Sequence, residues 1–104
     1  MSAQLTVIRW RDIPAQVVAK QGRETARREL TPRFQVAIDR AAMYAGLFGT
    51  DDYLAEWVRD TSPCGDDLEA EAAAEADRLE GLFSSERLNE LAANGGVQPD
   101  GGEQ

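Results

Sequence analysis

The side chains that most often carry enzyme chemistry are scarce in this sequence. It contains no histidine, so it cannot assemble Ser-His or Cys-His nucleophile pairs or histidine-zinc sites. Its single cysteine, Cys64, comes just before an expected helix start that favours a thiolate, but the carboxylates of Asp66 and Asp67 oppose one. The enzyme hypothesis would rest on Asp12, Arg11 and Cys64 converging within one pocket. We therefore expect a structural cysteine, no catalytic residue and no cofactor.

A regular acidic stripe is the only candidate for metal binding. Asp67, Glu71 and Glu75 recur at four-residue intervals within the acidic stretch 66–80. Carboxylate oxygens suit divalent cations, but an evenly spaced helical stripe lacks the converging loop of a calcium site. We interpret it as a solvated outer face without metal ligands, available as a negative surface to a basic partner.

The run at 10–16 is the first candidate for a binding site. Trp10, Arg11 and Asp12 supply an aromatic ring, a guanidinium and a carboxylate ahead of a proline-stiffened turn that reaches Gln16. A rigid polar loop of this kind suits recognition. Alternatively, Trp10 packs in the core while Arg11 and Asp12 pair with each other or with nearby termini, and such surface pairs contribute about 0–1 kcal/mol. Trp10, Arg11, Asp12 and Gln16 are the candidate interaction residues.

Charge is divided unevenly along the chain, whose formal net charge is −8. Residues 1–62 carry nine basic and eight acidic side chains, whereas residues 63–104 carry two basic and eleven acidic ones. Seven of the eight basic residues before Ala41 are arginines, which favour forked contacts with carboxylate or phosphate. We expect the two parts to face different partners.

An alternative interpretation is DNA binding by residues 23–59. A short arginine-bearing run followed by two expected helices resembles the order of ribbon–helix–helix repressors, in which alternate side chains of a strand read bases. Arg23, Thr25 and Arg27 would lie on that reading face. Glu29 on the same face and the net charge of −8 oppose contact with phosphates.

The hydrophobic pattern predicts strands at the beginning of the chain. Apolar and β-branched residues alternate over 5–10 and recur over 15–20, which indicates two strands with apolar side chains on much of both faces of the first. Gly22 suits a tight turn, so residues 23–30 would return as a third strand. That run is equally rich in good helix formers, and the choice stays open.

Helical spacing and capping residues predict about four helices after these strands. The first covers 32–45, with a threonine cap before Pro32 and Gly46 at its end. The second begins at Thr50 and ends before Pro63, with Tyr53, Leu54, Trp57 and Val58 as its apolar face. The third covers 66–83 behind a capping-box sequence, and the fourth begins after Ser84-Ser85, presents Leu88, Leu91 and Ala92, and stops at 94–96.

These elements indicate one α+β domain over residues 1–94, with a small N-terminal antiparallel sheet of two or three strands followed by the helices, and a flexible tail at 95–104. The expected core consists of Leu5, Val7, Ile8, Val17, Phe34, Ile38, Leu54, Trp57, Leu68, Leu79 and Phe83. No apolar run reaches the roughly 18 residues that span a bilayer, and one cysteine suits a reducing compartment, so we expect a cytoplasmic protein. A domain this small gains stability from a partner or from self-association.

Three segments carry a resemblance to a known family: 10–17 (WRDIPAQV), 37–51 (AIDRAAM, then GL and GTD) and 63–69 (PCGDDLE). They resemble the small bacterial "virulence factor" domain family, whose members are free-standing or close the larger conserved virulence factor C. The resemblance covers nearly everything before the tail and carries no established catalytic or ligand-binding residues. Because free-standing members are encoded beside corrinoid and folate one-carbon methyl-transfer proteins, it implies an accessory subunit. We therefore expect a non-catalytic interaction or accessory domain with a protein partner.

Overall fold

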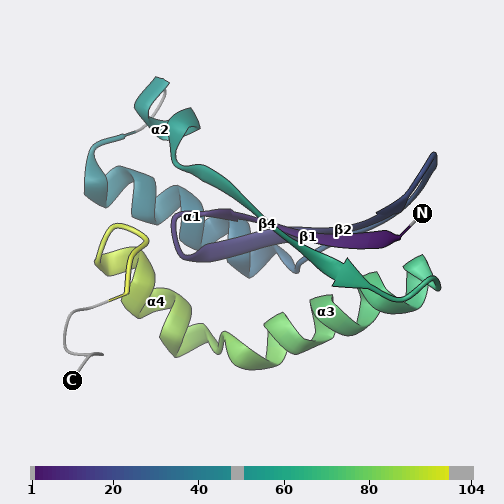
Figure 1. The fold of residues 1–104 in the computed structure, drawn as a ribbon. Coiled ribbons are helices and arrows are strands. Elements are labelled where there is room, and N and C mark those ends of the chain that lie inside the picture. The colour runs from purple at the N-terminus through teal and green to yellow at the C-terminus, as the bar shows by residue number, and fades with distance from the viewer. Residues whose placement is uncertain (1, 48–50, 99–104) are drawn as a thin grey trace.

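The computed structural model describes residues 2–47 and 51–98 (Figure 1). Within them a four-stranded antiparallel sheet has the order β3-β2-β1-β4. The strands are β1 (Ala3–Trp10), β2 (Ile13–Gln21), β3 (Glu24–Glu29) and β4 (Trp57–Cys64), and the helices are α1 (Pro32–Ala45), α2 (Asp51–Ala55), α3 (Leu68–Leu82) and α4 (Ser85–Ala93). The α+β class is confirmed, but the sheet has four strands where the sequence predicts two or three. None of the helices in these residues is long and apolar enough to cross a bilayer.

The first three strands form a meander. Gly22, with a φ of 61°, turns β2 into β3, so residues 24–29 are strand, and the helix alternative is wrong. Pairing with β2 and the burial of Ala26 outweigh the helix propensity of this run. A β-bulge interrupts the β1–β2 ladder, because Ile8 pairs with Gln16 while Arg9 pairs with Pro14.

Residues 57–64 are the main correction to the sequence analysis. They form β4 rather than the second half of a helix, and α2 covers only Asp51–Ala55. The edge of β1 offers a full antiparallel ladder to this segment, and the hydroxyls of Thr6 and Thr61 hydrogen-bond across it at 2.9 Å. Leu54, predicted in the core, is 62% exposed because the helix is too short to bury it. The predicted cap Thr50 lies outside the described residues.

The other helices begin and end close to the predicted positions. α1 ends at Gly46, whose φ of 74° provides the expected left-handed cap. Thr31 precedes α1, but its hydroxyl hydrogen-bonds with Glu80 instead of capping the helix. Side chains of Asp67 and Ser84 cap α3 and α4 by accepting backbone hydrogen bonds.

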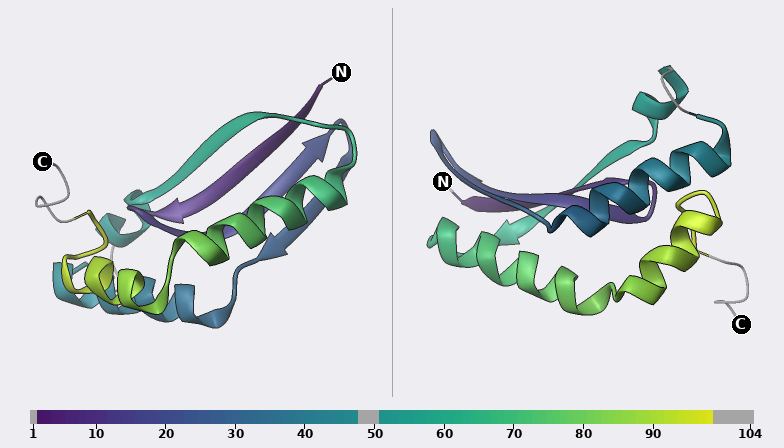
Figure 2. Two further views of the ribbon diagram at one scale, coloured as in Figure 1. Left: turned by 90° about the horizontal axis from the view of Figure 1, so that it is seen from below. Right: turned by 180° about the vertical axis from the view of Figure 1, so that it is seen from behind.

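The core lies between the sheet and the helices. α3 packs against β1, β2 and β3, whereas α1 packs against β2 and α4 (Figure 2). Trp10, Phe34, Ile13, Ile38, Leu91 and Val17 are the largest fully buried side chains. Most of the predicted core is buried or packs against it, whereas Ile8 is half-buried and lies on the other face of the sheet.

Candidate interaction surface

Trp10, the first predicted interaction residue, is fully buried. Its indole N–H donates to the carbonyl of Tyr53 at 2.9 Å, and the two rings stack with centroids 5.5 Å apart. A Cβ added to Gly96 would stand only 2.9 Å from the indole, so the C-terminal segment lies directly against it. Trp10 therefore joins α2 and residues 95–96 to the end of β1.

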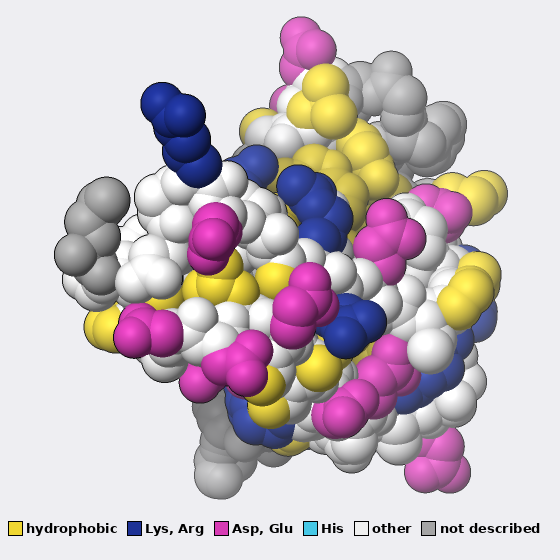
Figure 3. All heavy atoms as spheres, turned by 90° about the vertical axis from the view of Figure 1, so that its right-hand side faces the viewer, with side chains coloured by type: hydrophobic (Ala, Val, Ile, Leu, Met, Phe, Trp, Pro, Cys, Tyr) yellow, Lys and Arg dark blue, Asp and Glu magenta, His cyan; other side chains and the backbone are white. Residues whose placement is uncertain are grey.

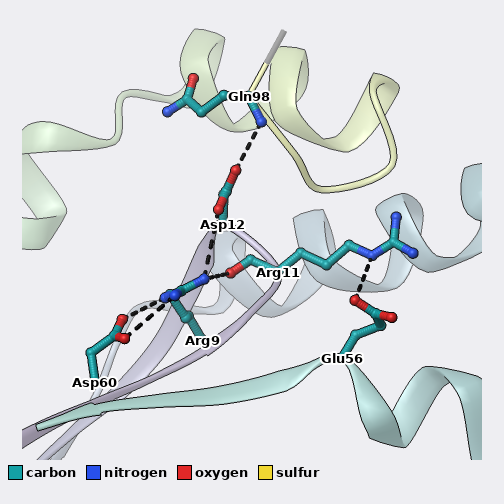
Figure 4. Close-up of polar contacts among 6 residues, drawn as sticks. All are labelled: Arg9, Arg11, Asp12, Glu56, Asp60 and Gln98. Carbon is teal, nitrogen blue, oxygen red and sulfur yellow. Dashed lines mark hydrogen bonds and ion pairs between the residues drawn. The ribbon is translucent and has the colours of Figure 1, made fainter.

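Arg11 and Asp12 bind the same C-terminal segment (Figure 4). Arg11, with a φ of 52°, donates to the carboxylate of Glu56 at 3.1 Å and to the carbonyl of Gly95 at 3.0 Å. Asp12 accepts a hydrogen bond from the Gln98 backbone at 2.9 Å, and its own N–H donates to Gly96 at 2.8 Å. These are the contacts of the structural alternative, and a binding role for this loop stays a prediction.

A groove of about 310 Å³ lies between β1, β4 and α3, and its charged side chains are already paired. Arg9 donates to Asp60 at 2.5 Å and to the carbonyl of Arg11, while Arg78 pairs with Glu75 at 2.6 Å. The hydrogen bond between Arg9 and Asp60 raises the pKa of Arg9 and lowers the pKa of Asp60. The charged side chains that line this groove therefore already neutralise one another.

Cys64 lies far from Arg11 and Asp12, so these three residues do not converge in one pocket. Cys64 pairs with Ala3 at one end of β1, whereas Arg11 follows the other end. Burial raises the pKa of the Cys64 thiol, and the carboxylates of Glu71 and Asp66 raise it further. The thiol is therefore held protonated at neutral pH.

The acidic stripe on α3 serves local contacts. Asp67 caps the helix and Glu75 pairs with Arg78. Across residues 2–47 and 51–98, no three metal-ligating side chains come close enough to hold an ion.

Most of the sheet face opposite α3 carries half-buried or exposed side chains in the described part of the chain. Residues that pair across antiparallel strands share a face, so the register assigns each side chain. We call the following set the open face: Gln4, Thr6, Ile8, Gln16, Val18, Lys20, Thr25, Arg27, Glu29, Trp57, Arg59, Thr61 and Pro63. Every one of them is half-buried or exposed. The register places Trp10 and Ile13 on the same side at the end of the β1–β2 ladder, but both are fully buried and do not belong to the open face.

Two adjoining hollows form a groove at the α1 end of the open face. One, of about 430 Å³, is lined by Ile8, Gln16, Trp57 and Arg59. The other, of about 390 Å³, shares Gln16 and Trp57 and continues past Leu30 to the start of α1. The upper part of Figure 3 shows hydrophobic side chains gathered beside Lys and Arg side chains on this side of the molecule.

The predicted Gln16 lies in this groove and accepts a hydrogen bond from Arg27 at 3.1 Å. Thr25 and Arg27, two of the residues of the DNA-binding alternative, share the open face as expected, and Arg23 lies in the turn beside it. The order of a ribbon–helix–helix unit is not present, however, because β3 pairs with β2 and residues 57–64 form a strand. The sequence did not lead us to predict site residues at Ile8, Trp57 or Arg59. The signal it offered for an uncovered apolar face was the presence of apolar residues on both faces of the strand at 5–10.

The fold and this surface define a small α+β domain whose sheet has one helix-covered face and one open face. Residues 8–92 match the family model described as "Virulence factor", and the chain belongs to that family. No curated protein and no solved structure matches the chain significantly.

Proposed function

We propose that this protein is a non-catalytic interaction or accessory domain that binds another protein through the open face of its sheet. The carrying observation is a contrast between the two faces. On the α3 side, Arg9 pairs with Asp60 and Arg28 pairs with Glu69. On the open face, Lys20, Arg27 and Arg59 have no ion pair with any described residue, and they flank apolar side chains that remain half-exposed.

Apolar surface rimmed by polar groups is typical of a protein-binding site. Arginine and tryptophan are also the residues that most often dominate binding energy at such sites. The partners we propose first are corrinoid and folate methyl-transfer proteins in the cytoplasm, which the family resemblance implies. DNA binding is the second candidate, because Thr25 and Arg27 are exposed on one face of β3.

The test is crosslinking affinity purification from the native host. Wild type is compared with an Arg27→Ala/Arg59→Ala double variant and with Arg40→Ala as a control, since Arg40 is an exposed arginine on α1. A specific protein recovered with wild type and the control but lost from the double variant supports the proposal. Equal recovery with all three, recovery of DNA alone, or turnover of a metabolite by the isolated chain refutes it.

The same purification tests the loop at 10–16. Arg11→Ala leaves the open face intact but removes the contacts with Glu56 and Gly95. We expect it to retain the partner and lower stability instead. Loss of the partner from a folded Arg11→Ala variant would move the site to this loop.

A further inference from the structure

We infer that the occupant of the open face is an acidic protein segment that inserts apolar side chains into the groove beside Trp57. The inference rests on the proposed function and names the chemistry of the partner. Its two parts are the charge of the open face and the shape of the groove at the α1 end of that face.

The charge of the open face is opposite to that of the whole chain. The open face carries three cationic side chains, Lys20, Arg27 and Arg59, and one carboxylate, Glu29. Its local charge is therefore +2 on a protein of net charge −8. Arg23 in the adjoining turn adds a fourth cation at the rim. With +2 on the open face, the rest of the chain carries −8 − 2 = −10, so an acidic partner is favoured at this face over the rest of the surface on average.

The shape of the groove suits apolar anchors. Ile8 and Trp57 line one hollow. The other is lined by Leu30 and Pro32 together with the polar side chains of Gln16, Glu29 and Gln35. Volumes of about 430 and 390 Å³ fall within the range of pockets that bind small groups. Arg59 lies in the wall of the first hollow, where it reaches a carboxylate next to an inserted side chain.

Single-stranded nucleic acid fits this face less well. Sheet surfaces that bind it stack successive bases on several aromatic rings. Here Trp57 is the only aromatic residue among the open-face set, and its ring already meets Tyr53 edge-on with centroids 6.2 Å apart. The net charge of −8 also opposes a polyanion at long range.

The inference is tested with a random dodecapeptide display library. Binders selected on wild type are counter-selected on an Arg27→Glu/Arg59→Glu variant, with Arg40→Glu as the matched control. We expect peptides rich in Asp and Glu around Leu, Phe or Trp. The best peptide should bind the double variant at least tenfold more weakly than wild type and the control, and Arg27→Lys/Arg59→Lys should recover part of the affinity. Thermal unfolding of each variant verifies that it is folded.

The binding position is read by nuclear magnetic resonance on ¹⁵N-labelled protein. Amide shifts from the peptide should concentrate on β1, β2 and β4 around Ile8, Gln16 and Trp57. Shifts confined to α3, basic consensus peptides, the absence of any binder, or tighter binding of a ten-nucleotide oligo-dT would each overturn the inference. If no peptide binds but a host protein crosslinks through the open face, the inference alone fails and the proposed function stands.

Discussion

Replacing Gly96 with alanine should destabilise the domain severely, because the added Cβ is disfavoured both by the backbone conformation and by the atoms around it. Gly96 has a φ of 91°, and a side chain there costs about 1–2 kcal/mol. The new Cβ would also lie 2.9 Å from Cζ3 of Trp10, 3.2 Å from Cε3 and 3.4 Å from the Ala41 side chain. Trp10 has no room to retreat, since it is fully buried, stacked on Tyr53 and hydrogen-bonded to it.

Overpacking a closed core costs about 1–3 kcal/mol. The two effects together predict a loss of about 2–5 kcal/mol, which is a large part of the roughly 5–15 kcal/mol that stabilises a typical domain. Urea unfolding followed by tryptophan fluorescence measures the free energy of unfolding directly.

Gly81 supplies the matched control. It lies within α3 with nothing inside 4 Å of an added Cβ, so Gly81→Ala should be neutral or stabilise by up to about 1 kcal/mol. A Gly96→Ala variant whose free energy of unfolding lies within 0.5 kcal/mol of wild type, a margin of about the usual surface effect, would refute the close packing of residues 95–96 on Trp10.

Three further predictions concern the core, an ion pair and the thiol. Leu91→Ala should cost about 2–5 kcal/mol because Leu91 is 1% exposed, whereas Leu54→Ala should change the free energy of unfolding by less than about 0.5 kcal/mol; equal effects in urea titrations would contradict the burial pattern. Burial alone would raise the pKa of Glu80, but hydrogen bonds from Thr31 and Arg33 outweigh it and hold the pKa below its ordinary 4.5. The stability that the ionised carboxylate contributes is therefore fully present above pH 4.5 and is lost as the pH falls through the lower pKa of the folded state. Glu80→Gln should therefore flatten the decline of stability in acid, and an unchanged slope of the free energy of unfolding against pH would count against the contact. Cys64 should react with iodoacetamide more slowly than free cysteine at pH 7.5, and Glu71→Gln should speed the reaction by lowering the raised thiol pKa; a fast wild-type reaction would mean an activated thiol.

The sequence predicted those elements whose signals are local. The helix over 32–45 has its proline, its apolar stripe and its terminal glycine within its own residues, and it forms as expected. β4 could not be recognised in this way, because Tyr53, Leu54, Trp57 and Val58 fit a helical face and the deciding partner is the distant edge of β1. Pairing between segments some fifty residues apart leaves no spacing signal in either one.

The candidate site shows the same division. Residue types at 10–12 indicated a rigid polar turn, but its partners are Glu56 and residues 95–98, which the local sequence does not reveal. The open face left a partial signal in the adjacent apolar residues Val7 and Ile8, since only one of them can point at α3. Which side stays uncovered depends on where the helices pack, and that is decided by the whole fold.

The segment at 95–98 has a practical consequence for anyone dividing the gene into pieces. The match to the family model ends at residue 92, four residues before the glycine that lies against the indole of Trp10. A fragment cut at that boundary would expose this ring to water and leave the carboxylate of Asp12 without the Gln98 backbone. The packing contacts of the domain therefore extend past the matched residues on its C-terminal side, and expression should retain at least residue 98.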